Sequence, residues 1–420
     1  MKIVSLPAIW LIILIAGIPQ LSETAYTPSL PAIAAALKST DSIAEYTLTI
    51  YLLGFAIGTL FWGIFSDRYG RKPCILAGFL FFIFGCVGCY FSNMMPMLML
   101  NRFIQAFGGS VGSVLGQALC RDAFHGIELG RAYAYVGSSL GVYPAIGPVI
   151  GGIIAEQFGW KNIFLFLIII SLFLTFMVAY FLPETHPFEH RKRISIKKVV
   201  TKLICDKRAI GFGLLVAACN GLNFSFFAEG SFYLIKLLGL SPSQYGLSFI
   251  AIAISMLLGG IASRKLHNNH EAKTIMNYGI NIILLGSSLF FITILLSTML
   301  FINNIILIIV VIIAQMILMF GSCMVFTNAL AMALVDYKNC IGTASSLFGF
   351  FYYSIISLFT FGMGALHNGT LFPMPLYFLF ISLFMVVIRK TLLEDYTSSL
   401  KSSIPNLHRG RYFNLLRQRP

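Results

Sequence analysis

The chain has 420 residues, of which 58% are hydrophobic and only 10% are charged, and its formal net charge is +14. Polar surface is too scarce to cover a water-soluble globule of this size, so a soluble protein is excluded. The composition indicates a polytopic membrane protein.

Twelve apolar stretches follow one another along the sequence. In chain order we predict membrane-spanning helices at residues 7–27, 46–66, 74–92, 96–119, 131–157, 162–182, 209–235, 244–263, 274–298, 303–332, 339–366 and 371–390. Each is near or above the ~20 residues that a helix needs to cross a bilayer. Strands are excluded because the stretches are continuously apolar rather than alternating.

The spans fall into two sets of six. Six fill residues 1–182 and six fill 209–391, with a basic linker at 183–208 and a basic tail at 392–420. This predicts an all-α membrane protein with twelve transmembrane helices in two six-helix bundles. Two bundles with a cavity between them suit alternating access, in which one half rocks against the other.

Lysine and arginine positions predict the orientation. If the amino terminus is cytoplasmic, the outer loops hold only Lys38, Lys161 and Lys236 of the 29 basic residues. Both termini are therefore expected in the cytoplasm of a bacterium, with the helices in its inner membrane. Attraction to anionic lipid accounts for the net charge, so we expect a lipid bilayer and no nucleic acid as partner.

Three ionisable side chains lie well inside the predicted spans: Glu23, Arg102 and Glu229. A charge in hydrocarbon costs several kcal/mol unless it is paired or hydrated, so each is a candidate functional residue. Glu23 and Arg102 lie at similar depths and could meet. They would form either a permanent ion pair that fixes packing or a proton-carrying carboxylate tuned by the guanidinium. Glu229 is the second candidate proton carrier.

Neighbouring polar side chains could line the same cavity. Gln20 and Tyr26 are one turn from Glu23 on one helix face. Arg102 and Gln105 begin a stripe that continues at spacings of three and four as Gly109, Gly112 and Gly116. Bare glycines along a stripe predict that another helix approaches closely there.

The next span is unusually rich in glycine and proline. These residues permit either a gating hinge or tight helix packing, and the sequence leaves both open. The positions are Gly141, Pro144, Gly147, Pro148, Gly151 and Gly152.

The loop after the second span combines glycines with charged residues: Gly63, Asp67, Arg68, Gly70, Arg71 and Lys72. Together with two of the patterns above, it resembles motifs of the major facilitator superfamily. The loop after the second span resembles its signature loop, Arg102 to Gly108 resembles its fourth-helix motif, and the glycine-proline span is similar to the motif of its proton-coupled antiporters. The whole chain looks most like the bicyclomycin and chloramphenicol resistance group of drug exporters.

The resemblance has a departure in the first helix. In that group the carboxylate usually lies two residues before the tyrosine, a position that is Thr24 here. Glu23 is one position earlier, which turns it by ~100° about the helix axis.

The loop also has a physical rationale. Asp67 can accept hydrogen bonds from Arg71 and from backbone N–H groups near Gly342, where the start of a helix favours an anion. Such a latch would close the cytoplasmic side, with Gly70 allowing the tight turn.

Together these features predict a monomeric, proton-coupled exporter of small amphipathic molecules that needs no cofactor or metal. All seven histidines fall in loops or the tail. A dedicated metabolite or siderophore exporter, or nutrient uptake by proton symport, remains an alternative, as does a polytopic receptor or membrane enzyme. The aromatic residues of the second half could either line a hydrophobic substrate cavity or face the lipid. They are Phe224, Phe226, Phe227, Tyr352 and Tyr353.

Overall fold

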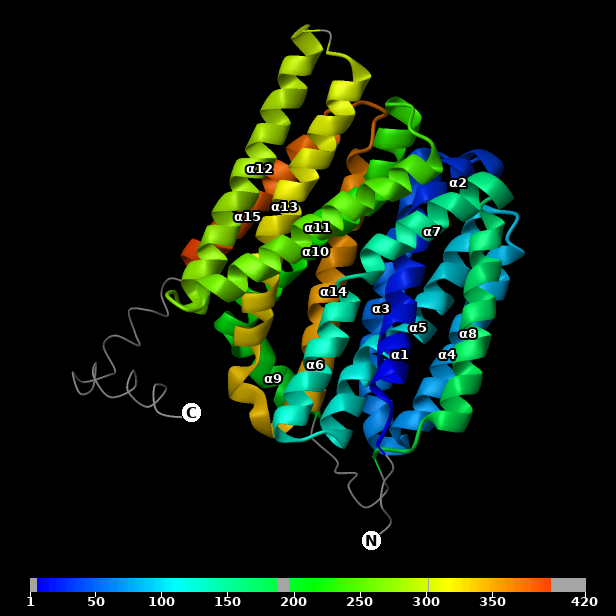
Figure 1. The fold of residues 1–420 in the computed structure, drawn as a ribbon, viewed down its shortest axis with the longest axis vertical. Helices are drawn as coiled ribbons and strands as arrows, with labels where there is room; N and C mark the ends of the chain where they lie inside the picture. Colours follow the sequence, from blue (N-terminus) through cyan, green and yellow to red (C-terminus); the bar gives the residue numbers. More distant parts are fainter. Residues whose placement is uncertain (1–5, 187–195, 301, 394–420) are drawn as a thin grey trace, which may run out of the picture.

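The structure, a computed structural model, describes residues 6–186, 196–300 and 302–393. Within these ranges the regular elements are all helical, and Figure 1 shows them as two groups standing side by side. The first group holds α1 (Ile9–Ala25), α3 (Asp41–Tyr69), α4 (Arg71–Tyr90), α5 (Met95–Ala123), α6 (Gly126–Leu140), α7 (Tyr143–Phe158) and α8 (Lys161–Phe181). The second holds α10 (Lys207–Ser231), α11 (Pro242–Leu266), α12 (Ala272–Leu300), α13 (Asn304–Ala333), α14 (Ile341–Leu366) and α15 (Pro373–Ile388).

Eleven helices in the described ranges are long and apolar enough to span a membrane. They match eleven of the twelve predicted spans. The remaining one, predicted as continuous over 131–157, is interrupted at Gly141 and Val142, which separate α6 from α7. Pro144 lacks the N–H that would continue the helical ladder, so the break follows from the sequence.

Several short elements were not predicted. After α1 come η1 (Thr27–Ser29) and α2 (Leu30–Ala36), and a π-helical turn, η3 (Phe232–Leu237), extends α10. The predicted linker contains α9 (Ile196–Cys205), whose Val199 and Leu203 are buried in one apolar cluster with Tyr337 and Leu347 of the second half. Their i, i+4 spacing is the amphipathic signal for this helix.

We call the end of the molecule that carries α9 the linker face, and the end that carries α2 the distal face (Figure 1). The loop between α3 and α4 and the start of α14 lie at the linker face. The start of α3 and the end of α14 lie at the distal face.

The two halves meet along two seams, α3 against α14 and α7 against α11. In the first seam a Cβ atom at Gly63 would lie only 2.0 Å from Ser346 Oγ, and Ser357 donates a 2.9 Å hydrogen bond to the Thr49 carbonyl. In the second seam a Cβ at Gly152 would lie 2.4 Å from Pro242 O. Glycines therefore set how closely the halves approach.

Candidate functional site

Arg102 of α5 is fully buried between two tyrosine rings. Its guanidinium carbon lies 4.0 Å from the ring centroid of Tyr26 and 4.1 Å from that of Tyr51. Nη1 donates a 2.7 Å hydrogen bond to Gln105 Oε1 and a longer one, 3.5 Å, to Ser22 O. A desolvated cation over an aromatic face is stabilised by about 2 kcal/mol or more, so two rings offset part of its burial cost.

Glu23 does not form the ion pair with Arg102 that the sequence suggested. The carboxylate is buried, and its Oε1, like Nε and Nη2 of Arg102, has no hydrogen-bond partner among the described residues. The tyrosine rings cover the faces of the guanidinium and hold it in place. Glu23 still interacts electrostatically with Arg102 and with the phenol of Tyr353 from the second half.

The tyrosines are themselves held by neighbouring helices. The Tyr51 hydroxyl donates a 3.1 Å hydrogen bond to the Pro19 carbonyl of α1, and the Tyr26 hydroxyl is hydrogen-bonded to Thr47 of α3. Gln20 is half-buried one turn before Glu23. Three helices thus fix the guanidinium near an unpartnered carboxylate.

The predicted glycine stripe of α5 does receive another helix, and that helix is α1. A Cβ at Gly112 would lie 2.1 Å from the Ile15 carbonyl oxygen, and one at Gly116 would lie 2.9 Å from Ala16 Cβ. Because Pro19 has no N–H, that carbonyl lacks its usual helical donor. The close approach brings Glu23 and Tyr26 to the level of Arg102.

The glycines of α7 pack against the end of α1. A Cβ at Gly147 would lie 2.0 Å from Thr24 Oγ1, and one at Gly151 would lie 1.6 Å from Ala25 O. Position 24 therefore faces α7 at contact distance, with no space for a carboxylate. Gly147 and Gly151 therefore pack tightly, as one interpretation predicted, and the gating hinge stays a prediction.

We predict that Gly151→Ala lowers stability, whereas Gly137→Ala does not. The new methyl group at position 151 would overlap the α1 backbone, and overpacking costs about 1–3 kcal/mol. A Cβ at Gly137 meets nothing within 4 Å, and alanine is the better helix former by about 1 kcal/mol. Thermal unfolding of the purified variants in detergent measures this, and equal midpoints would contradict it.

At the linker face, Arg71 joins two carboxylates and a hydroxyl. It donates hydrogen bonds to Asp67 (2.7 Å), Asp122 (2.8 Å) and Ser66 (2.7 Å). Gly70 has a φ of 100°, which confirms that the turn requires glycine. Arg68 is exposed and lies over the Tyr69 ring, and Lys72 is half-buried.

Asp67 also faces the start of α14. A Cβ at Gly342 would lie 3.9 Å from Asp67 Oδ2 and 3.9 Å from Arg121 Nη2. The carboxylate therefore lies beside the helix start that the sequence suggested, and the residues around it come from both halves.

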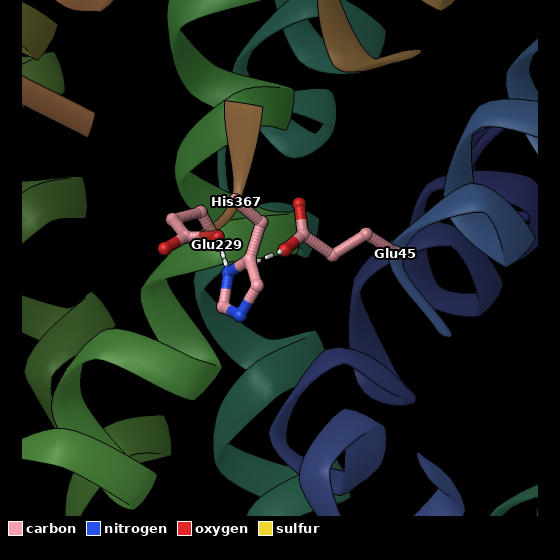
Figure 2. A group of neighbouring side chains, drawn as sticks. All are labelled: Glu45, Glu229 and His367. Atoms are coloured by element: carbon pink, nitrogen blue, oxygen red, sulfur yellow. Dashed lines mark hydrogen bonds and ion pairs between the residues drawn. The ribbon is translucent and has the colours of Figure 1, made fainter. Parts of the chain in front are cut away.

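A second cluster of charged side chains, at the distal face, joins both halves. His367, at the end of α14, lies between Glu229 of α10 and Glu45 of α3 (Figure 2). His367 Nδ1 is 2.7 Å from Glu229 Oε2 and 3.3 Å from Glu45 Oε1, and its Nε2 is 3.5 Å from Asp41 Oδ2. Lys236 Nζ lies 2.5 Å from the same Asp41 oxygen. Glu45 and Glu229 are fully buried.

Comparison with known proteins decides the family. The model of the Major Facilitator Superfamily matches residues 12–360. This chain belongs to that superfamily. It is similar to an "Uncharacterized transporter" of Rickettsia bellii (34% identity, 91% of this chain and 95% of the relative). It is also similar to the "Bicyclomycin resistance protein homolog" of Haemophilus influenzae (26%, 79% and 82%).

The fold comparison agrees. The chain superposes on a bacterial homolog of the human lysosomal transporter Spinster, in an inward-facing and occupied conformation, with a TM-score of 0.70. The two share 13% identity over 95% of this chain and 98% of the other. The expected major facilitator fold and the resemblance to the bicyclomycin and chloramphenicol resistance group are thus confirmed. The protein is a membrane transporter.

In this major facilitator protein, sequence reasoning identified Glu229 as a site residue but missed Glu45 and His367, which lie beside it. The second span was predicted to begin at residue 46, which left Glu45 outside it. The helix begins at Asp41, because the Thr40 hydroxyl caps it by accepting from the Ile43 N–H. That capping residue was the available signal. Glu229, unpaired along the sequence, is bonded to His367.

The aromatic residues of the second half fall into two groups. Phe226 and Phe227 are buried and pack on Phe249 of α11, so lipid-facing positions are wrong for them. Tyr353 contacts Phe55 across the α3–α14 seam, with ring centroids 4.4 Å apart. Tyr352 lies beside Tyr353, and both are partly exposed.

Proposed function

We propose that this major facilitator protein is a proton-coupled exporter of drugs or other small amphipathic molecules. One observation carries the proposal: Glu23 is a buried carboxylate without an ion-pair partner, held near Arg102 and close to the tyrosines of the seam between halves. The name of the Haemophilus influenzae relative supports the substrate class.

The proposed orientation places the linker face in the cytoplasm of a bacterium. The support is the distribution of basic residues, since the outer loops would hold only Lys38, Lys161 and Lys236. The distal face then lies outside, and efflux runs from the linker face to the distal face.

In the proposed cycle Glu23 carries the proton. An ionised carboxylate without a partner in hydrocarbon costs free energy, so Glu23 holds a proton. It releases the proton when water, substrate or a movement of Arg102 stabilises the negative charge. Tyr352 and Tyr353 offer ring faces and hydroxyls to an amphipathic substrate at the seam. Rocking of one half about the glycine contacts then exposes the seam to either side in turn.

The test is transport in a host that lacks its own efflux pumps. We expect resistance to several unrelated compounds, and pH-gradient-dependent accumulation of those compounds in inverted membrane vesicles. Collapse of the gradient with a protonophore should abolish accumulation. Export of a single native metabolite would favour a dedicated exporter, and uptake with the proton would favour symport; either result would overturn the multidrug assignment.

A further inference from the structure

We propose that Glu45, Glu229 and His367 form a proton-binding site that is complete only when the distal side is closed, so that protons from that side close it. The proposal rests on the alternating access of the proposed function. It does not depend on which substrate is carried.

The site is divided between the two halves. Glu45 belongs to α3, whereas Glu229 and His367 belong to α10 and to the end of α14. The Asp41–Lys236 ion pair crosses the same boundary. Opening the distal side must therefore separate Glu45 and Asp41 of one half from Glu229, His367 and Lys236 of the other.

The closed site carries more negative charge than its protein partners balance. The ligand atoms of Glu45, Glu229 and His367 lie within 4.8 Å of one another. Neither Glu45 oxygen, nor Glu229 Oε1, has a hydrogen-bond donor among the described residues. Two ionised carboxylates this close in low dielectric repel strongly, so one of them must hold a proton.

His367 holds its own proton in this setting. The Glu229 carboxylate accepts from its Nδ1 and raises the pKa of His367, although burial opposes the shift. The ring packs edge-on against Phe232, with centroids 5.5 Å apart, and the His367 side chain is 8% exposed. Around the site the titratable groups of the described residues are Asp41, Lys236 and the Tyr233 phenol, which donates to Leu371 O.

Opening reverses this balance. Once the halves separate, water reaches the site, and a hydrated glutamate is ionised at neutral pH. Closing is therefore linked to proton uptake, and the ratio of closed to open molecules should change about tenfold per pH unit for one linked proton. With the distal face outside, an acidic exterior favours return to the inward-facing state, as export coupled to proton entry requires.

A divalent metal ion is the competing occupant, because two carboxylates and a histidine are also zinc ligands. The geometry favours the proton. His367 Nδ1 and Glu229 Oε2 are 2.7 Å apart, in direct hydrogen-bond contact, whereas two ligands of one zinc ion at ~2.0–2.2 Å would lie farther apart.

The experiment measures distal closure directly, without substrate. Spin labels at Ala36→Cys and Thr370→Cys, in a cysteine-free background reconstituted in nanodiscs with EDTA, report the separation of the halves from pH 5 to 9. We expect the short-distance population to grow as pH falls, with the ratio changing about tenfold per unit. In Glu45→Gln/Glu229→Gln, which leaves neither side chain able to ionise on opening, the short distance should persist at every pH.

Glu156→Gln is the matched control. Glu156 accepts from the Ser243 N–H across the other seam at the distal face, but it is exposed, so its removal should leave the titration unchanged. Glu45→Gln alone provides a second test if the double variant does not fold, and it should weaken the pH dependence. A wild-type distance that ignores pH, an unaltered titration in the glutamine variants, or closure that appears only on adding Zn²⁺ would overturn the proposal. Because no substrate is present, a failed drug panel would leave it standing.

Discussion

Glu23→Gln is expected to abolish efflux driven by a pH gradient while the protein still folds and binds substrate. Glutamine keeps the size of the side chain but cannot exchange a proton. The carboxylate has no ion-pair partner here, so removing its charge breaks no salt bridge and folding should survive. Gradient-driven efflux should fall to the level of vesicles without the protein, because the proposed coupling step is lost rather than slowed.

Two assays separate coupling from transport itself. Substrate exchange across proteoliposomes without a gradient should persist in Glu23→Gln, since it needs the cavity but no net proton movement. Glu128→Gln is a matched control, because Glu128 is an exposed carboxylate of α6. It should transport normally in both assays. Undiminished gradient-driven efflux in Glu23→Gln would remove Glu23 from the mechanism and leave Glu229 as the candidate carrier.

Features with a local cause were predictable from the sequence. Span lengths follow from the hydrocarbon thickness, and the turn at Gly70 follows from a backbone conformation that other residues rarely adopt. The glycine stripe ending at Gly116 predicted a close helix neighbour, though it could not say that the neighbour is α1. The break at Gly141 was not predicted, because the span 131–157 was taken as continuous.

Features that depend on contacts across the chain were not predictable. Depth in the membrane alone suggested that Glu23 pairs with Arg102. In the fold the guanidinium instead packs between the rings of Tyr26 and Tyr51. His367 was set aside as a loop histidine. Its role depends on Glu229, which is bonded to it from 138 residues away in the sequence. Periodicity identifies a buried face, but it does not identify the residue on the opposite helix.

Asp67→Asn is expected to shift the transporter toward the state that is open at the linker face. Asparagine keeps the size but loses the charge beside the start of α14 and the ion pair with Arg71. The ion pair with Arg71 lies within one half, so only the interaction with the start of α14 differs between the states. A carboxylate at a helix start contributes about 0.3–1 kcal/mol, which corresponds to a shift of about two- to fivefold in the equilibrium between states.

The shift is measured by the labelling rates of single cysteines, after the native cysteines have been replaced. These cysteines are placed along α6 and along the linker-face half of α11. In Asp67→Asn these rates should rise and efflux should fall, while substrate binding survives, because a cycle that cannot reseal one side cannot complete. Arg71 keeps its bonds to Asp122 and Ser66, so the loop should stay folded and the effect should be one of gating. Glu128→Gln, which changes an exposed carboxylate of α6, should leave labelling and efflux unchanged. Equal labelling and normal efflux in Asp67→Asn would mean that Asp67 belongs to a charged loop without a gating role.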